Sequence, residues 1–278
     1  MILNSKNLVM SIKDNIKSFV SGLVESGKRV PCLVTILVGD DPASKVYVAN
    51  KEKACKEVGI ENDTVRLPDY TSERDLLKII DFYNKDITVD GILVQLPLPK
   101  HINEELVIKS ISPEKDVDGF HPDNVANLWL GNDCIKPCTP QGIIDLIDEA
   151  NINLEGKNVV VIGRSNIVGL PVAKMCLDRN ATVTICHSKT KQLQEITQKA
   201  DVIIVAVGRP CFLKGDMVSE GVIVIDVGIN RVDGKLVGDV DFQTVVEKAH
   251  LITPVPGGVG PMTIACLLKN TLMCYNKK

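Results

Sequence analysis

A lysine on an otherwise apolar helix face is the first residue whose position suggests chemistry. In the segment 43–60, Tyr47, Val48 and Cys55 fall on one helical arc of about 140°, and Lys51 lies inside that arc one turn after Tyr47. Two interpretations stay open. The side chain extends its amine to solvent from the edge of the arc, or burial strips water from the amine and makes it usable as a base near neutral pH. In the second case Tyr47 offers a bound ring its flat face or its hydroxyl.

Two further polar residues stand out from their surroundings. Gln95 lies inside the apolar strand sequence 90–99, and a buried amide needs hydrogen-bond partners. The carboxyl ends of strands in open α/β sheets are also where ligands bind. Asp118 lies in the loop sequence 112–124 and forms an acidic pair with Asp116. No third ligand stands at a suitable spacing, so no metal ion is predicted.

An apolar β-branched run over 158–162 leads into a glycine-containing turn. The turn begins at Gly163, and a helix is expected from Gly169. A strand, a turn and a helix N-terminus form an anion site, because free backbone N–H groups and the helix dipole converge there. The spacing is not the GxGxxG of dinucleotide folds, since Arg164 and Ser165 stand where a second glycine is expected. A purely structural turn in a parallel sheet is the alternative.

The tip of the next strand, 182–190, favours a phosphorylated cofactor. NAD-binding folds place an acid about 20 residues beyond the glycines to hold the ribose hydroxyls. This tip carries no acid: Ser188, Lys189 and Thr190 present two hydroxyls and a cation, and Arg164 adds a second cation. Donors and positive charge suit the oxygens of a 2′-phosphate. The turn is therefore predicted to bind NADP rather than NAD.

Strands and helices alternate around these residues, which predicts an α/β fold with parallel sheets and right-handed crossovers. The expected strands are 31–39, 64–68, 90–99, 158–162, 182–186, 202–207 and 222–227. The expected helices are an amphipathic one over 8–23, then 43–58, 72–85, 140–150, 169–179, 190–199 and 261–273. The stretch 102–139 is expected to be irregular. Two lobes are expected, joined near 119–140.

Composition narrows the class of protein. The 278 residues, 45% of them hydrophobic, suffice for two α/β lobes with buried cores. A net charge of −3 gives no basic footprint, which argues against nucleic acid or an anionic membrane as a partner. No apolar run approaches the roughly 20 residues needed to span a bilayer. The nine cysteines form no CxxC pair and are interpreted as reduced thiols of a cytoplasmic protein.

Eight segments, in order along nearly the whole chain, resemble the bifunctional methylenetetrahydrofolate dehydrogenase/cyclohydrolase (FolD) family. They are YVANKEKACKEVGI, GILVQLPLP, PEKDVDGFHPDN, PCTPQG, GRSNIVGLP, CHSKT, DVGIN and TPVPGGVGPMT. The resemblance implies two activities at one site. The first oxidises 5,10-methylenetetrahydrofolate to the methenyl form with NADP, and the second hydrolyses the product to 10-formyltetrahydrofolate. The implied role is in one-carbon metabolism.

The resemblance also implies an organisation. A catalytic domain is expected over 1–139, completed by the C-terminal helix 261–278, and a Rossmann-type, doubly wound NADP-binding domain over 140–260. A homodimer formed largely through the nucleotide domain is implied, with a tetrahydrofolate derivative as small-molecule substrate. The chain leaves no room after PGGVGPMT for a formyltetrahydrofolate synthetase domain, so that activity is not expected.

Roles for residues on the folate side follow from the resemblance. Lys51 resembles the catalytic base or proton shuttle of the hydrolytic step, and Gln95 the residue that positions it. Tyr47 resembles the ring that packs on the folate. Asp118 resembles the carboxylate that binds the pterin edge, where adjacent ring N–H donors pair with it. The folate side is completed by Gly260 and Pro261.

The resemblance implies that the cofactor contacts are Gly163, Arg164, Ser165, Ser188 and Ile229. Other functions stay open on the residues alone. One is a dehydrogenase with little hydrolase activity, and another is an NADP-dependent reductase of the shikimate-dehydrogenase kind. A third is a non-catalytic nucleotide sensor or scaffold, against which Lys51 and Gln95 argue, since a sensor does not need a buried amine.

Overall fold

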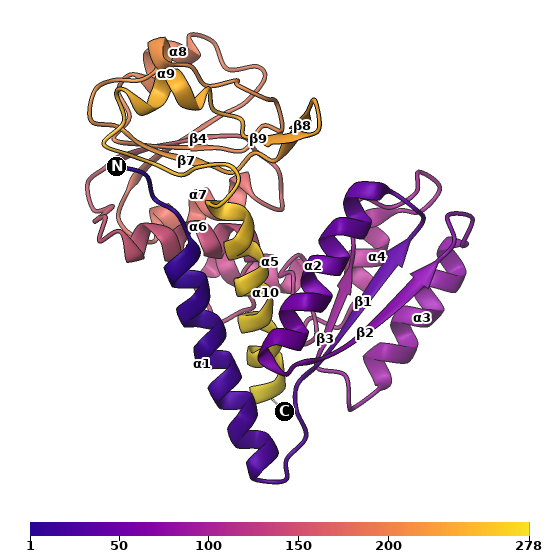
Figure 1. The fold of residues 1–278 in the computed structure, drawn as a ribbon. Helices are drawn as coiled ribbons and strands as arrows, with labels where there is room; N and C mark the ends of the chain where they lie inside the picture. The colour runs from indigo at the N-terminus through magenta and orange to yellow at the C-terminus, as the bar shows by residue number, and fades with distance from the viewer. Residues whose placement is uncertain (278) are drawn as a thin grey trace. The chain divides into compact units, whose positions relative to one another are not determined.

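The computed structural model describes residues 1–277, and its contacts divide the chain into two compact units. Unit 1 comprises Met1–Val9 and Thr139–Thr263, and unit 2 combines Met10–Cys138 with the chain from Ile264 onward. Each unit is thus built from two separate stretches of the chain (Figure 1). The division falls within three helices, which are α1 (Lys6–Glu25), α6 (Cys138–Glu149) and α10 (Val259–Asn276).

Unit 2 contains a parallel sheet in the order β2-β1-β3. Its elements are β1 (Cys32–Val38), α2 (Pro42–Val58), β2 (Glu61–Leu67), α3 (Glu73–Lys85), β3 (Gly91–Val94), α4 (Glu104–Ser110) and α5 (Pro122–Leu130). The chain passes from β1 to β2 on one side and to β3 on the other, so the strand order reverses between β1 and β3. Ligands in open α/β sheets bind at the carboxyl edge of such a reversal. The strand β3 ends at Val94, so the residues that follow it lie at the edge of the sheet where a site is expected.

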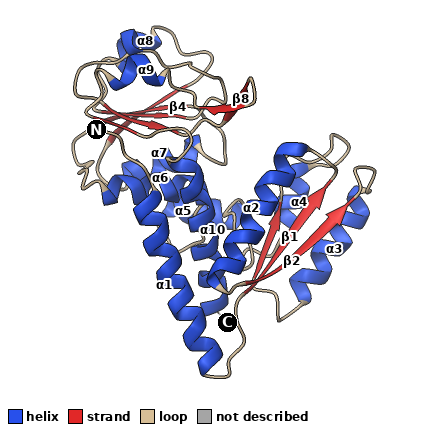
Figure 2. Ribbon diagram, viewed as in Figure 1, coloured by secondary structure: helices blue, strands red, loops and turns tan. Residues whose placement is uncertain are grey.

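Both faces of this sheet are covered by helices (Figure 2). Val34 and Ile36 of β1 join the buried side chains of α3 and α4 in one cluster. Leu33, of opposite parity, joins α1, α2 and the C-terminal part of α10 in another. Successive strand residues point to opposite faces, so a strand buried on both sides must be apolar throughout, as CLVTILV nearly is.

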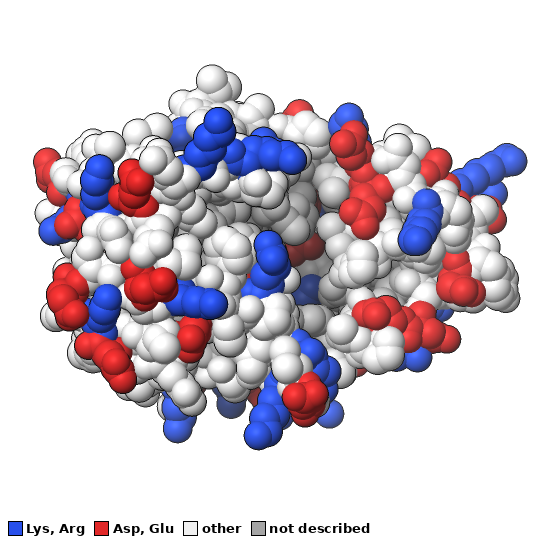
Figure 3. Space-filling model, turned by 90° about the horizontal axis from the view of Figure 1, so that it is seen from above, with Lys and Arg blue, Asp and Glu red and all other residues white. Residues whose placement is uncertain are grey.

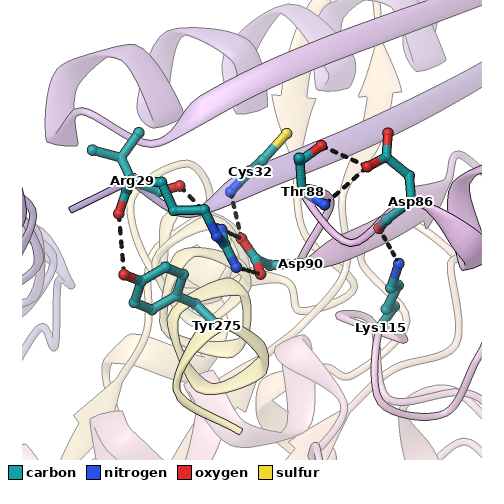
Figure 4. A network of polar contacts seen from close by, with 8 residues as sticks. Arg29, Cys32, Asp86, Thr88, Asp90, Lys115 and Tyr275 are labelled. Carbon is teal, nitrogen blue, oxygen red and sulfur yellow. Dashed lines mark hydrogen bonds and ion pairs between the residues drawn. The ribbon is translucent and has the colours of Figure 1, made fainter. Parts of the chain in front are cut away.

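A polar network in unit 2 links the start of β1 to the end of α10 (Figure 4). Arg29 donates two hydrogen bonds, of 2.6 and 2.7 Å, to the carboxylate of Asp90, which is fully buried and also accepts the Cys32 N–H. Tyr275 lies with its ring under the Arg29 guanidinium and donates its hydroxyl proton to the Arg29 carbonyl. The pairing raises the pKa of Arg29. The last turns of α10 are thereby tied to the sheet of unit 2.

The expectation that 102–139 is irregular was wrong in part. The segment contains α4 and α5, each started by local chemistry that outweighs its loop-like composition. Asn103 caps α4 by accepting the Leu106 N–H, and Pro122 occupies the first turn of α5, where a missing N–H costs nothing. Gly131 ends α5 in the left-handed conformation.

Unit 1 contains a second parallel sheet, in the order β10-β7-β6-β4-β5. Its elements are β4 (Asn158–Ile162), α7 (Gly169–Leu177), β5 (Thr182–Cys186), α8 (Leu193–Thr197), β6 (Val202–Val205), the 3-10 helix η1 (Gly215–Met217), β7 (Ile223–Asp226), β8 (Asn230–Val232), β9 (Lys235–Val237), α9 (Phe242–Val246) and β10 (Leu251–Ile252). The order reverses between β4 and β6, which makes this a doubly wound sheet. The α/β fold class with parallel sheets is confirmed.

Short elements of unit 1 escaped the sequence pattern. The strands β8 and β9 form an antiparallel hairpin, and β10 is a two-residue strand that pairs with β7. Elements this short carry too few residues for a period to be counted. The chain start adds to the same edge, since Leu3 N–H donates to the Ile252 carbonyl.

The surface carries charges of both signs. On the face shown in Figure 3, Lys and Arg side chains lie among Asp and Glu side chains, and neither sign forms a continuous patch. Among residues 1–277, no helix has the length and apolarity that crossing a membrane requires.

Candidate active site

The predicted site residues divide between the two units. Unit 2 holds Lys51, Tyr47, Gln95 and Asp118, and unit 1 holds Gly163, Arg164, Ser165, Ser188, Ile229, Gly260 and Pro261. The first group lies on α2, directly after β3 and in the turn between α4 and α5. The second group lies at the carboxyl ends of β4, β5 and β7 and at the start of α10.

Helix α2 presents Lys51 from a well-anchored position. The helix starts at a cap in which the Asp41 carboxylate accepts the Ser44 N–H at 2.7 Å. Val48, Cys55 and Val58 of the same helix are buried. Lys51 lies partly buried beside this apolar face, and Tyr47, one turn earlier, is 37% exposed. The fold thus fixes the backbone of the lysine and leaves the tyrosine ring accessible.

Lys51 is hydrogen-bonded to Gln95. Its Nζ donates to Gln95 Oε1 at 3.0 Å, while Gln95 Nε2 donates to the Leu96 carbonyl at 2.7 Å. The second bond fixes which end of the amide faces the lysine. The Gln95 N–H donates to the Ile36 carbonyl, which holds the residue in line with β3. The predicted positioning role of Gln95 therefore has a geometric basis, because the strand end orients an acceptor toward the amine.

Asp118 lies in a turn organised by Asp116. The buried Asp116 carboxylate accepts the Gly119 and His121 N–H groups at 3.1 and 2.7 Å, and the Asn124 side-chain amide at 2.9 Å. Gly119 has φ +71°, and a Cβ there would lie 2.7 Å from backbone atoms of Lys136 and Pro137. The turn is thus fixed on both sides of Asp118. The Asp116 side chain thus accepts hydrogen bonds from the backbone of the turn that contains Asp118.

The electrostatics of Asp118 follow from this position. Desolvation raises the pKa of Asp118 to about 6, a shift that the charge of Lys51 reduces and that of Asp116 increases. Burial also raises the pKa of Asp116, against the hydrogen bonds that it accepts. Asp118 at neutral pH is therefore a carboxylate whose charge the protein does little to neutralise. Such a group gains from a ligand that brings paired N–H donors.

Asn270 of α10 is a contributor that the sequence did not reveal. This buried side chain donates to the carbonyls of Val117 and Lys136 at 2.8 and 2.9 Å, and to Cys138 Sγ at 3.4 Å. It holds the residue preceding Asp118 from a point far along the chain. The one signal in the sequence was an amide on an apolar helix, which is a weak signal because buried amides are common in structural roles.

The glycine turn of unit 1 lies where the strand order reverses. A Cβ at Gly163, where φ is +130°, would lie 2.3 Å from the Ala206 carbonyl oxygen, so β4 and the residue after β6 approach too closely for a side chain. A Cβ at Gly169 would lie 2.3 Å from the Gly163 oxygen. Both glycines are therefore needed to bring the start of α7 against the end of β4. A backbone cradle of this kind fits a dinucleotide phosphate.

The polar residues of this turn differ in whether their side chains form hydrogen bonds within the protein. Ser165 Oγ accepts the N–H groups of Val168 and Gly169 at 3.2 and 3.3 Å, so its oxygen holds the backbone where α7 begins. Arg164 is exposed and makes no hydrogen bond or ion pair within residues 1–277. The predicted direct contact from Ser165 to a ribose phosphate stays a prediction, and the geometry gives this residue a structural task as well.

The tip after β5 lies beside the glycine turn. Ile162 and Cys186 are partners across the parallel pair β4–β5, and the Gly163 N–H donates to the Cys186 carbonyl at 2.9 Å. Thr190 Oγ1 closes the tip by accepting the His187 N–H at 2.8 Å. Ser188 and Lys189 are left exposed. Together with Arg164 they form a group of donors at adjacent strand ends.

Ile229 and Gly260 are neighbours in unit 1. Ile229, in the turn after β7, is 42% exposed, and a Cβ at Gly260 would lie 3.2 Å from Ile229 Cδ1. Pro261 follows in the first turn of α10. The structure thus brings Ile229, a predicted cofactor contact, next to Gly260, a predicted folate contact.

The doubly wound parallel sheet, with its glycine cradle at the reversal and free cations at the adjacent strand end, defines unit 1 as a dinucleotide-binding unit. The second unit presents a lysine held by a glutamine amide, together with the partly buried carboxylate of Asp118. Such a chain belongs to the class of two-unit α/β enzymes that use a dinucleotide cofactor.

Comparison with known families gives a more specific result. Residues 3–118 match the model of the tetrahydrofolate dehydrogenase/cyclohydrolase catalytic domain, and residues 137–278 match that of the NAD(P)-binding domain. A curated relative, the "Bifunctional protein FolD" of Halalkalibacterium halodurans, is 56% identical over 98% of this chain and 97% of its own length. The chain belongs to the tetrahydrofolate dehydrogenase/cyclohydrolase family.

Solved structures agree. The bifunctional FolD enzyme of Campylobacter jejuni superposes with a TM-score of 0.97 at 52% identity, covering 100% of this chain and 99% of that one. The Trypanosoma brucei enzyme, solved with NADP cofactor and inhibitor, gives a TM-score of 0.96 at 36% identity, with coverages of 100% and 97%. The predicted family, its two enzyme activities and the nicotinamide cofactor are confirmed.

A shikimate-dehydrogenase-like enzyme was one alternative on the residues alone. Shikimate dehydrogenase from Aquifex aeolicus has a TM-score of 0.55 at 13% identity, covering 86% of this chain and 91% of that one. This likeness concerns the fold alone. The family membership above decides against the alternative.

Proposed function

We propose that the protein oxidises 5,10-methylenetetrahydrofolate with NADP and hydrolyses the methenyl product to 10-formyltetrahydrofolate, with the predicted residues in their predicted roles. The observation that carries the assignment is the hydrogen bond from Lys51 to Gln95, in the unit that also holds the Asp118 carboxylate. An oriented amine is a group that can transfer the protons that hydrolysis requires. The relatives' designation as bifunctional supports the same conclusion.

The residues of unit 1 fit a nicotinamide dinucleotide. NADP supplies the hydride acceptor when it is bound. Gly163 and Gly169 provide the close backbone approach that a pyrophosphate needs. Ile229 offers an exposed apolar surface in the turn after β7. Ser165 holds the N–H groups of Val168 and Gly169 at the start of α7, the helix end proposed to face the phosphates.

The preference for NADP over NAD rests on the donors beside the turn. Arg164 and Ser188 are exposed at neighbouring strand ends, and the tip after β5 has no acid to accept ribose hydroxyls. A guanidinium pairs with a phosphate through two parallel N–H bonds. The NADP complex of the Trypanosoma brucei enzyme supports the proposal.

Hydrolysis is assigned to the residues of unit 2. Water adds to the methenyl carbon and loses a first proton, which leaves a hydroxyl group on that carbon. The hydroxyl proton is then released to solvent as the formyl C=O forms, and one C–N bond breaks as the ring nitrogen gains the first proton. Lys51 Nζ is the group proposed to accept and return that proton. Gln95 Oε1 accepts a hydrogen bond from the amine at 3.0 Å, so the amine keeps one orientation through the steps of the reaction. Positioning of this kind removes the search for a reactive geometry.

Substrate binding is assigned to four residues. Asp118 pairs with the N–H donors of the pterin edge, and the exposed ring of Tyr47 packs on the folate. Gly260 and Pro261, which belong to unit 1, are the other two proposed substrate-binding residues. The absence of a side chain at Gly260 leaves Ile229 uncovered.

The larger organisation is also proposed. The catalytic domain spans 1–139 with 261–278, and the NADP-binding domain spans 140–260. The protein works as a cytoplasmic homodimer joined through the NADP-binding domain, in the one-carbon metabolism that serves purine, histidine and methionine biosynthesis. Sedimentation at several concentrations tests the dimer, and a monomer throughout would refute it.

Two separate assays test the function. The first follows reduction of NADP, or of NAD, by methylenetetrahydrofolate, and NADP is expected to be strongly preferred. The second follows loss of methenyltetrahydrofolate absorbance without nucleotide, at a rate above that of the buffer. A protein that reduces neither cofactor, or that leaves methenyl decay at the buffer rate, would contradict the proposal.

A further inference from the structure

The carboxylate of Asp239 gathers donors from two turns of unit 1. It is fully buried, and its Oδ2 accepts the N–H groups of Val207 and Gly208 at 2.7 and 2.8 Å. Its Oδ1 accepts the Arg209 N–H and the Asn230 side-chain amide, both at 2.9 Å. Three consecutive backbone N–H groups after β6 and one side chain after β7 thus converge on a single carboxylate.

A second buried carboxylate holds Asp239 in place. Asp226, the last residue of β7, accepts the Gly228 and Asp239 N–H groups through Oδ1 at 3.0 and 2.9 Å. Its Oδ2 accepts the Val240 N–H at 3.0 Å. Within residues 1–277, neither carboxylate has a basic side chain as an ion-pair partner. Their charges are stabilised by N–H groups alone.

Two glycines show how closely the backbone wraps these carboxylates. A Cβ at Gly228 would lie 2.2 Å from Asp239 Oδ1, and a Cβ at Gly238 would lie 1.8 Å from Asp226 Oδ2. Side chains at these positions are therefore excluded by the carboxylates themselves. The arrangement leaves no space for a bound ligand, so the carboxylates act on the backbone around them.

The turns that they hold lie at the cofactor edge of the sheet. Val205 of β6 and Asp226 of β7 are register partners, so the turns 207–209 and 227–229 follow adjacent parallel strands. Nucleotides bind outside the carboxyl ends of such strands. Ile229 lies between Gly228, which Asp226 holds, and Asn230, which Asp239 holds.

We propose that Asp239 is a positioning residue for the nicotinamide dinucleotide. Its carboxylate sets the path of both turns and thereby the place of Ile229, without touching the cofactor. The proposal rests on the proposed function, since it assumes that these turns contact NADP. Asp239 lies in the sequence GDVD, which by itself does not indicate a role in cofactor binding.

The experiment compares the two activities in Asp239→Asn. The asparagine amide replaces one carboxylate oxygen, an acceptor, by an NH2 group that faces N–H donors. Leaving one of those buried donors unpaired costs enough free energy to change the affinity for NADP about tenfold. The KM for NADP is expected to rise about tenfold or more. Methenyl hydrolysis without nucleotide is expected to stay within about twofold, because Lys51 and Gln95 belong to unit 2. The matched control is Asp233→Asn, an exposed aspartate of the β8–β9 turn, which should change neither.

Each result decides the proposal. An unchanged KM for NADP in Asp239→Asn, or an equal loss of both activities, would overturn it, since a merely structural residue lowers both in proportion. If Asp239→Asn does not fold, Asn230→Ala decides: it removes one of the four contacts, and its KM for NADP should rise about threefold with hydrolysis unchanged. The wild-type protein run in parallel separates the hypotheses, because a wild type without NADP reduction refutes the proposed function instead.

Discussion

The two groups of site residues differ in how far the protein engages them without a ligand. In unit 2, Lys51 is bonded to Gln95, and the turn that carries Asp118 is fixed by Asp116 and Asn270. In unit 1, Arg164 and Ser188 are exposed at the ends of their strands. The residues proposed to do chemistry are held in one geometry, whereas the residues proposed to bind a phosphate acquire their partner from the ligand.

This difference predicts different kinetic consequences. Changes in unit 2 should lower the rate of the hydrolytic step, since an oriented group is lost from the reaction. Changes at the cofactor turn should weaken binding and leave hydrolysis of methenyltetrahydrofolate in place. The following variants test that separation, from the largest expected effect to the smallest.

Lys51→Met should abolish hydrolysis. Methionine keeps much of the apolar stem and removes the amine, and a general acid or base contributes roughly 10²- to 10⁴-fold. Binding of NADP, measured by fluorescence titration, should survive. The control is Lys56→Met, an exposed lysine of the same helix, which should keep both activities. Unchanged hydrolysis in Lys51→Met would remove the role given to this residue.

Arg164→Ala combined with Ser188→Ala should weaken NADP about 100-fold, while NAD is weakened far less. Each charge-assisted hydrogen bond to the 2′-phosphate is worth about 1.5–3 kcal/mol, and NAD lacks that phosphate. The measurement is the Kd of each nucleotide. Arg231→Ala, which changes an exposed arginine elsewhere in unit 1, serves as the control. Equal losses for the two nucleotides would defeat the 2′-phosphate argument.

Gln95→Leu should lower the kcat of hydrolysis about tenfold. Leucine roughly preserves the volume but offers Lys51 no acceptor, so the amine samples other orientations, at a cost comparable to one hydrogen bond. The Kd for NADP should not move, since Gln95 belongs to unit 2. A kcat equal to that of the wild type would show that Lys51 does not need this partner.

Asp118→Asn should stabilise the protein in a pH-dependent way. Burial raises the pKa of Asp118 from 3.8 to about 6, so the folded state favours the protonated form. The favourable contribution is complete below pH 3.8 and is lost as the pH rises through about 6. The variant cannot ionise, so it should gain on the order of 2 kcal/mol over the wild type above that pH.

Urea unfolding at several pH values measures this gain. The advantage of Asp118→Asn should shrink as the pH falls from neutral toward 4. The same variant should bind folate more weakly, because an amide replaces the charged acceptor of the pterin N–H donors. A stability difference that is independent of pH would contradict the electrostatic account of Asp118.

Much of the fold was predictable because its elements are long and periodic. The strands β4 and β5 match their predicted ranges, and α2 differs by one residue at its start. The polar residues that break the period, Lys51 and Gln95, were visible for the same reason. They stand out only where the neighbouring residues are apolar.

Other parts of the site were not predictable from local sequence. Asn270 lies 153 residues from the Val117 carbonyl that it holds, and Asp239 lies 32 residues from Val207. Such contacts depend on how the chain returns to a sheet edge, which no short window records. Asp116 was visible in the sequence, but its role as a backbone acceptor depends on a turn geometry that the letters DVDG do not specify.

The stoichiometry of the complete reaction tests the central claim most directly. The purified protein is given methylenetetrahydrofolate and NADP, and NADPH and 10-formyltetrahydrofolate are measured in the same sample over time. The account predicts one formyl product for each NADPH, with the methenyl intermediate remaining low. NADPH formed while methenyltetrahydrofolate accumulates and decays only at the buffer rate would contradict it, as would the absence of NADPH.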